Sequence, residues 1–155
     1  MTPGINLAKK QKIAHTVHEY THDPDSESYG QEAADKLGVP ASRVFKTLVV
    51  SLDNKTLAVA VLPVSGMLSM KQIARAAGAK KATMAAPADV ERATGYVLGG
   101  VSPLGQKKRL KTIIDVSAAD YDTVYISAGR RGLEIELSPD DLKSLTNAVL
   151  AEICQ

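Results

Sequence analysis

The sequence predicts a mixed α+β domain, α/β in the broad sense, that spans residues 1–155 as a single unit. We expect a twisted, largely antiparallel sheet of six or seven strands, curled toward a barrel and surrounded by helices. The length of 155 residues fits one domain. Strand-like and helix-like segments interleave without a regular βαβ period, which favours antiparallel over parallel pairing. The chain is 45% hydrophobic and 23% charged, as is typical of globular proteins.

Capping residues and apolar spacing indicate the helices. Thr2-Pro3 and Ser138-Pro139 each place a hydroxyl N-cap before a proline at the first helical position. Ser69 is the expected N-cap of a segment whose apolar residues recur at helical spacing, and Gly78 is a typical C-terminal glycine. The expected helices cover residues 3–11, 31–37, 70–77, 87–93 and 139–153, the last with Leu142, Leu145, Val149 and Ile153 on one side.

β-Branched and apolar runs indicate the strands, which we expect at residues 15–20, 44–51, 56–62, 81–84, 112–115, 123–127 and 133–137. Asp53-Asn54 separates two of these runs and predicts a hairpin turn. Residues 57–61 are apolar on both faces, so this strand should lie at the centre of the sheet.

Composition excludes several classes of protein. The single cysteine, Cys154, allows neither an intramolecular disulfide nor a cysteine-rich zinc site. Its position on the expected last helix makes it a poor nucleophile candidate. One Phe, five Tyr and no Trp argue against broad stacking platforms for single-stranded nucleic acid. The sequence begins without an apolar signal region, and no apolar run is long enough for a membrane span. We therefore expect a cytoplasmic protein without membrane contact.

The basic residues are clustered although the net charge is only +2. Lys80 and Lys81 form one cluster and Arg130 and Arg131 another. The third comprises Lys107, Lys108, Arg109 and Lys111. The clusters are either solvated turns or a surface that binds a polyanion.

Lys46 is an unusual residue for its position. It shares a strand face with Val44, Leu48 and Val50, in a strand that the pattern places inside the sheet. Lysine is almost never fully buried without a partner. It can extend to the sheet edge or face a polar cavity, where it could bind a phosphate, a carboxylate or a developing oxyanion.

The segment from Leu98 to Gln106 contains three glycines in seven residues. Such a loop lets backbone amides approach a ligand closely and can form an anion site, or it can be a tight structural turn. It matches neither the Walker A nor the dinucleotide-binding pattern. The basic residues that follow it suit the sugar–phosphate backbone of a nucleotide end.

Other candidate chemistry is weaker. His15 and His18 should point to opposite strand faces and His22 lies in a loop, so we expect no metal site. His18 shares a face with Tyr20, and both could reach the cavity near Lys46. The pattern contains no Ser-His-Asp signature. Glu134 and Glu136 share one strand face, which we expect to be solvated.

These residues occur in long motifs that resemble the YbaK family of bacterial Cys-tRNA(Pro) deacylases, related to the editing domain of bacterial prolyl-tRNA synthetase. The similarity extends along nearly the whole chain. It includes residues 1–3, 18–24, 30–34, 45–48 and 94–96. Its most distinctive part runs from Gly99 to Arg109.

The resemblance implies a trans-acting enzyme that deacylates Cys-tRNA(Pro), and Cys-tRNA(Cys) as well, without a cofactor. The substrate thiol would attack its own ester carbonyl and release a cyclic thiolactone and free tRNA. Prolyl-tRNA synthetase would join enzyme and tRNA in a ternary complex. Catalysis would involve Lys46, Gly99 and Gly100. The substrate would contact Tyr20, Thr47, Val101, Ser102, Ser127 and Gly129. The tRNA backbone would contact Lys107, Lys108, Arg109, Arg130 and Arg131.

Two alternatives remain at this point. The enzyme could remove another small amino acid such as alanine, or the chain could be a non-catalytic module that binds tRNA or a synthetase. The family usually reads Ser-Gly-Gly-Lys-Arg-Gly where this chain has residues 127–132. Ala128 replaces a glycine there, which would matter if that position required a positive φ.

Overall fold

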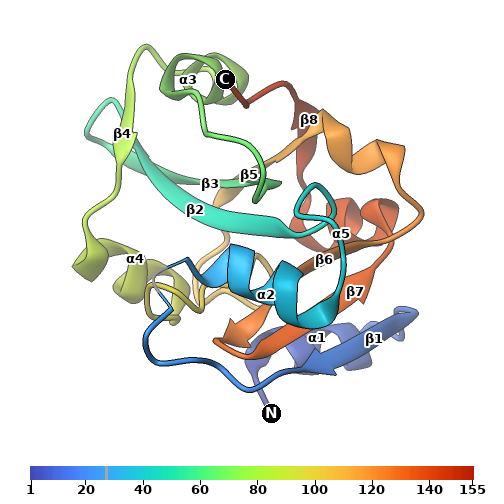
Figure 1. Cartoon of the computed structure of the whole chain (residues 1–155). Helices are drawn as coiled ribbons and strands as arrows, with labels where there is room; N and C mark the ends of the chain where they lie inside the picture. Colours follow the sequence, from blue (N-terminus) through green and yellow to red (C-terminus); the bar gives the residue numbers. More distant parts are fainter. Residues whose placement is uncertain (27) are drawn as a thin grey trace.

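The structure is a computed structural model that describes residues 1–26 and 28–155. It confirms the mixed α+β class (Figure 1). The helices are α1 (Pro3–Lys10), α2 (Tyr29–Leu37), α3 (Met70–Ala77), α4 (Pro87–Thr94), η1 (Val116–Asp120, a 3₁₀ helix) and α5 (Pro139–Thr146). The strands are β1 (His15–Glu19), β2 (Phe45–Leu52), β3 (Thr56–Pro63), β4 (Ala82–Met84), β5 (Lys111–Asp115), β6 (Val124–Arg130), β7 (Leu133–Leu137) and β8 (Val149–Ala151).

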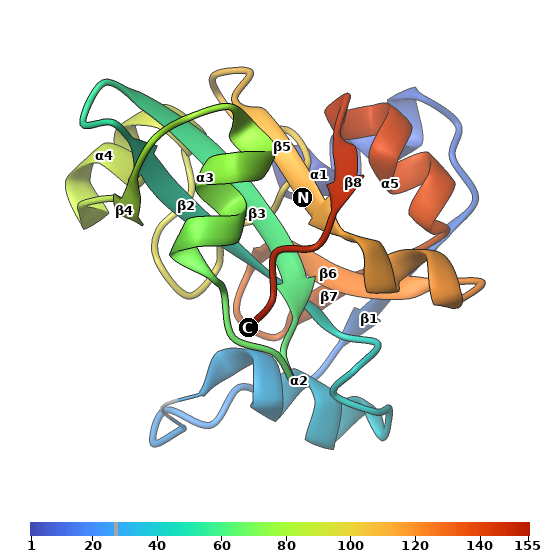
Figure 2. The same ribbon diagram turned by 90° about the horizontal axis from the view of Figure 1, so that it is seen from above.

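Five strands form one sheet in the order β4-β2-β3-β5-β8. The β2–β3 hairpin turns at Asp53 and Asn54, both with positive φ, as the sequence predicts. β3 is the central strand, and its residues from Ala58 to Pro63 are all buried. The pairs β3–β5 and β5–β8 are parallel, so this sheet is mixed. Figure 2 shows α3 lying across one face of it, where Ile73 and Ala74 pack against the sheet.

The remaining strands form an antiparallel sheet in the order β1-β7-β6. The expected single sheet is therefore wrong: the described strands form two sheets and close no barrel. The reason is a shared core, because Phe45 and Val61 of the first sheet pack with Ile126 and Ile135 of the second. Two facing sheets bury these side chains without a continuous ladder.

The helix starts follow the capping prediction. The Thr2 hydroxyl accepts a hydrogen bond from the Ile5 amide, and the Ser69 hydroxyl accepts one from the Gln72 amide. The final helix is shorter than expected: α5 ends where Asn147 adopts a left-handed conformation. None of the helices in the described part of the chain is long and apolar enough to cross a membrane.

The residues after α5 return to the five-stranded sheet. Val149 pairs with Ile113 in a parallel ladder, and Cys154 forms a bridge with Leu68. The expectation that Val149, Ile153 and Cys154 continue a helix is therefore wrong. The backbone hydrogen bonds of this segment are made with β5 and with the loop before α3, which places Cys154 beside that loop.

Candidate functional site

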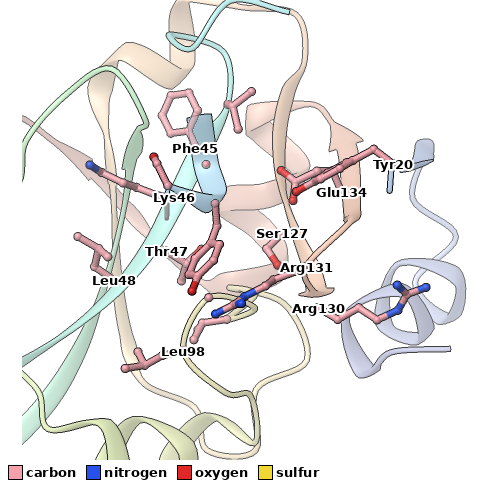
Figure 3. A pocket seen from close by; sticks show the side chains of 16 residues that line it. Tyr20, Phe45, Lys46, Thr47, Leu48, Leu98, Ser127, Arg130, Arg131 and Glu134 are labelled. Carbon is pink, nitrogen blue, oxygen red and sulfur yellow. The ribbon is translucent and has the colours of Figure 1, made fainter. Parts of the chain in front are cut away.

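A cavity of about 270 Å³ lies between the two sheets, the first turn of α2 and the glycine-rich loop (Figure 3). Its floor is the part of β2 from Phe45 to Leu48. β4 pairs only with Val50 to Leu52 of β2, so the backbone edge of the earlier residues is left to border the cavity. The topology therefore brings Lys46 and the glycine-rich loop together, as the sequence suggests.

Lys46 lines the cavity and is half-buried. Its Nζ donates a hydrogen bond to the carbonyl oxygen of Gly66, at 2.8 Å. Figure 3 shows the side chain pointing away from Ser127 and Arg131. Burial lowers the pKa of its ammonium. Lys46 thus borders the cavity and has its charged end on a neighbouring loop, which combines the two interpretations that the sequence left open.

The segment that follows β8 supports the loop that holds Lys46. The Ser69 amide donates to the Ile153 carbonyl and the Gln155 amide to the Met67 carbonyl. Cys154 lies against Gly66 inside this pairing. Burial, together with the nearby Asp115 carboxylate, raises the pKa of the Cys154 thiol to about 11. Cys154 is therefore a packing residue, because its thiol stays protonated near neutral pH.

We expect Gly66→Ala to lower the free energy of unfolding by about 1 kcal/mol, since overpacking of a filled site is destabilising. A Cβ at Gly66 would lie 3.0 Å from the Cys154 sulfur. Cys154→Ala removes that sulfur, so the double variant should cost less than the sum of the two single variants. Urea denaturation of the four proteins measures this coupling. Additive effects would contradict the contact.

Two buried polar groups at the cavity are candidates for contact with a ligand. The Thr47 hydroxyl is buried and makes no hydrogen bond. Glu134 is only 6% exposed, and burial raises the pKa of its carboxyl to about 8. Buried polar groups are normally hydrogen-bonded, so the unpartnered Thr47 hydroxyl, in the same cavity as a desolvated carboxyl, indicates a place for a polar ligand.

Glu134 was missed by the sequence reasoning, and its expected solvation is wrong. Its strand alternates Leu133, Glu134, Ile135 and Glu136, which is typical of one solvated face. Glu136 remains partly accessible and accepts a hydrogen bond from the Thr123 hydroxyl. Glu134 is buried because β7 lies between β1 and β6 with the cavity over its end. Such an arrangement of strands leaves no signal in a local pattern.

Tyr20 and Ser127 both line the cavity, as expected. Tyr20 is held by its amide, which donates to the Gly132 carbonyl. Burial and the nearby Glu134 raise the pKa of the Tyr20 phenol. The Ser127 hydroxyl accepts a hydrogen bond from the Gly129 amide, and Ser127 is the cross-strand neighbour of Glu134. Hydroxyl groups and one carboxyl therefore occupy the same end of the cavity (Figure 3).

The glycine-rich loop divides into two parts. Gly99 and Val101 line the cavity, and Gly99 has a φ of +90°. Gly100 is buried behind them, and its amide donates to the Val97 carbonyl at 3.0 Å. Ser102 is fully buried and its hydroxyl accepts from the Leu104 amide. Gly99 and Val101 therefore line the cavity, whereas Gly100 and Ser102 lie behind its wall.

The β6–β7 turn also differs from expectation in part. Gly129 does not line the cavity; its φ is +120°, and an added Cβ would lie 2.7 Å from the Tyr96 ring. Ala128 is buried in the core and does not have a positive φ, so it fits where the family has glycine. The Arg131 side chain turns toward the cavity, whereas the Arg130 side chain points away from it (Figure 3).

The other basic clusters lie away from the cavity. The Lys107 and Lys108 amides donate to carbonyls at the end of α4, and the exposed side chains of Lys107, Lys108 and Arg109 do not line the cavity. Lys108 shares a separate surface groove with Lys55 and Arg92. The basic surface is therefore split between the cavity mouth and the α4 side of the molecule.

Each histidine has its own partner. His15 Nδ1 lies 2.6 Å from the Ile13 carbonyl oxygen, His18 Nε2 lies 2.9 Å from Glu136, and His22 Nδ1 lies 2.6 Å from Glu32. His18 does not line the cavity, so the interpretation that it acts there with Tyr20 is wrong. Among the residues that the structure describes, no group of three His, Cys, Asp or Glu side chains could hold a metal ion.

The chain is similar to known proteins along most of its length. Residues 23–145 match the family described as "Aminoacyl-tRNA editing domain". A protein of Enterococcus faecalis (strain ATCC 700802 / V583), named "Putative Cys-tRNA(Pro)/Cys-tRNA(Cys) deacylase EbsC", is 39% identical over 153 residues, which cover 98% of this chain and 92% of that protein. YwhH of Bacillus subtilis (strain 168), an uncharacterized protein, is 29% identical over 126 residues, or 81% of this chain and 80% of that one.

Solved structures share the fold. "Hypothetical protein APE2540" superposes with a TM-score of 0.87 at 25% identity, covering 99% of both chains. "A putative trans-editing enzyme for prolyl tRNA synthetase" superposes with a TM-score of 0.83 at 22% identity, covering 100% of this chain and 99% of that one. These likenesses extend over the whole fold, and the family match includes β2 and the glycine-rich loop. The resemblance found in the sequence is thus confirmed, and the chain belongs to the aminoacyl-tRNA editing domain family.

Proposed function

We propose that this protein is a trans-acting editing enzyme that deacylates Cys-tRNA(Pro), and Cys-tRNA(Cys) as well. The observation that carries the proposal is a cavity that has groups to bind an aminoacyl ester and lacks an activated nucleophile. Lys46, Thr47 and Glu134 supply charge and hydrogen bonds, whereas no described lining residue is a cysteine or a histidine. The name of the Enterococcus faecalis relative supports the choice of substrate.

In the proposed reaction the substrate supplies the nucleophile. The cysteinyl sulfur attacks its own ester carbonyl carbon, the bond from that carbon to the ribose oxygen breaks, and the ribose oxygen receives the thiol proton. The products are a cyclic thiolactone and tRNA with a free terminal hydroxyl. The enzyme contributes by holding the reacting atoms together and by stabilising the developing oxyanion.

The cavity offers a group for each polar part of an aminoacyl ester. The α-ammonium would lie against Glu134, whose carboxyl it would convert to the charged form. Thr47, Tyr20 and Ser127 would supply hydrogen bonds. Lys46 has a long side chain that can turn from the Gly66 carbonyl to the ester oxygen.

Basic residues around the mouth would hold the tRNA. Arg130 and Arg131 lie at the edge of the cavity. Lys107, Lys108 and Arg109 would contact the tRNA backbone farther along the acceptor end. Because the basic surface is divided and the net charge is only +2, tRNA binding by this protein alone should be weak. We therefore propose that prolyl-tRNA synthetase holds the tRNA in a ternary complex, which co-sedimentation with synthetase and tRNA tests.

The substrate proposal predicts a strong preference among charged tRNAs. The enzyme should deacylate Cys-tRNA(Pro) and leave Ala-tRNA(Pro) and Ser-tRNA(Pro) largely intact, because only cysteine carries a thiol. The measurement is the loss of radiolabelled amino acid from each tRNA, with a no-enzyme control. Equal loss of all three would contradict the thiol mechanism and favour an activated water, and no loss of any would favour a binding module.

A further inference from the structure

The cavity mouth carries a stacked pair of side chains, Tyr29 and Arg131, of which the proposal above uses only the charge of Arg131. The guanidinium of Arg131 lies 3.5 Å from the centre of the Tyr29 ring. Tyr29 begins α2, and Arg131 belongs to the β6–β7 turn, so the pair joins two walls of the cavity. Figure 3 shows Arg131 turned inward over the glycine-rich loop.

The pair is held from behind. Arg131 Nη1 lies 3.5 Å from His22 Nε2, and His22 Nδ1 lies 2.6 Å from the buried Glu32 carboxylate. The His22 ring also contacts the Tyr29 ring edge-on, at 5.9 Å between centres. The guanidinium and the ring are therefore fixed in position before any ligand arrives, although Arg131 stays exposed.

The glycine-rich loop contacts this pair with its backbone at Gly99. A Cβ at Gly99 would lie 2.7 Å from both the Arg131 guanidinium and the Tyr29 ring, so no side chain fits between them. Beside Gly99, Val97 and Leu98 are 60% and 52% exposed. The mouth thus combines a planar cation, an aromatic ring and the solvent-facing aliphatic side chain of Leu98.

The size of the cavity limits what can enter it. Pockets for drug-sized ligands hold roughly 300–1,000 Å³. The 270 Å³ cavity suits the aminoacyl group and its ester, and the base of the esterified adenosine must then remain at the mouth. A base that has left its stack is commonly bound on arginine and aromatic planes.

We propose that the Tyr29–Arg131 pair is the binding site for the terminal adenine base of the aminoacyl-tRNA, with Leu98 packing against the base. This inference rests on the proposed function, because it assumes that the ester lies in the cavity. It assigns Arg131 a planar stacking contact, whereas a phosphate contact would require only its charge.

The test uses two stable amides that bind without reacting. One is 3′-deoxy-3′-(cysteinylamino)adenosine, and the other is the same cysteinyl amide on a ribose that lacks the base. NMR titration measures both dissociation constants for the wild type. We expect the adenosine compound to bind at least about 5-fold more tightly, since stacking contributes roughly 1–3 kcal/mol per base.

Two variants then locate the base. Arg131→Lys keeps the charge and Tyr29→Leu keeps the apolar character, and each should remove most of the difference between the two compounds. Arg75→Leu, an exposed arginine on α3, is the matched control and should preserve it. Arg131→Lys changes an exposed side chain, so the test stands even if Tyr29→Leu fails to fold.

The proposal is overturned if the base adds nothing to wild-type affinity, or if its contribution survives in Arg131→Lys. Because these binding measurements involve no turnover, their outcome does not depend on the outcome of the deacylation assay. Both proposals are supported if the variants lose the contribution of the base to affinity and the wild type deacylates Cys-tRNA(Pro). A base contribution in a protein that deacylates nothing refutes the proposed function alone.

Discussion

Replacing Lys46 by alanine should lower kcat/KM for Cys-tRNA(Pro) deacylation by about 100-fold, as for the loss of one group that stabilises an oxyanion. Lys46 is the single lysine among the described residues that line the cavity, so no neighbouring ammonium can replace it. Its side chain is half-buried, and the ester would develop negative charge in a partly desolvated space. Single-turnover deacylation rates measure the effect.

Lys71→Ala serves as the control, because Lys71 is an exposed lysine on α3. It should react like the wild type. Lys46→Arg should recover little activity, since a planar guanidinium does not replace a compact ammonium in a filled site. If Lys46→Ala reacts within twofold of the wild type, Lys46 does not take part in catalysis.

Glu134→Gln should change how the stability of the protein depends on pH. Burial raises the pKa of Glu134 to about 8 in the folded protein, against an ordinary value of 4.5. The unfolded chain therefore releases this proton at lower pH than the folded protein does, and folding stability falls as the pH rises from about 4.5 to about 8. Glutamine does not titrate, so the variant lacks this loss.

Urea denaturation at pH 5, 7 and 9 measures the difference between the two proteins. The free energy of unfolding of Glu134→Gln relative to the wild type should increase by at least about 2 kcal/mol between pH 5 and pH 9. The comparison cancels every other titrating group, including the three histidines. Parallel pH profiles would show that the Glu134 carboxyl is not desolvated in the folded protein.

Much of the fold could be predicted from local sequence. Thr2, Ser69 and Ser138 were identified as N-caps because a hydroxyl before a helical pattern acts on amides two or three residues away. The β2–β3 hairpin was also predictable from a local signal, the Asp53-Asn54 turn. The end of α5 was not predictable in this way. Val149 continues a helical apolar pattern, but in the structure it pairs with Ile113 of β5. The division into two sheets also depends on contacts that no local pattern specifies.

The site was predictable in part for the same reason. Lys46 was conspicuous because a lysine is unusual on an apolar strand face, and Gly99 because it belongs to a loop that is unusually rich in glycine. Glu134 and Tyr29 did not, since a strand glutamate and a helix-end tyrosine are unremarkable until the chain folds around them. Gly100 and Ser102 belong to the same distinctive motif as Gly99, but the local pattern did not show that they lie behind the cavity wall, where both make hydrogen bonds within the loop.

The identity of the released product tests the central claim most directly. Cys-tRNA(Pro) carrying labelled cysteine is incubated with the enzyme, and the early products are separated by rapid acid quench and chromatography. Because no described residue that lines the cavity is a cysteine or a histidine and the substrate carries a thiol, we predict that cyclic thiolactone is the first labelled product and that free cysteine appears later by its hydrolysis. Free cysteine as the first product, at the full rate of deacylation, would contradict this account.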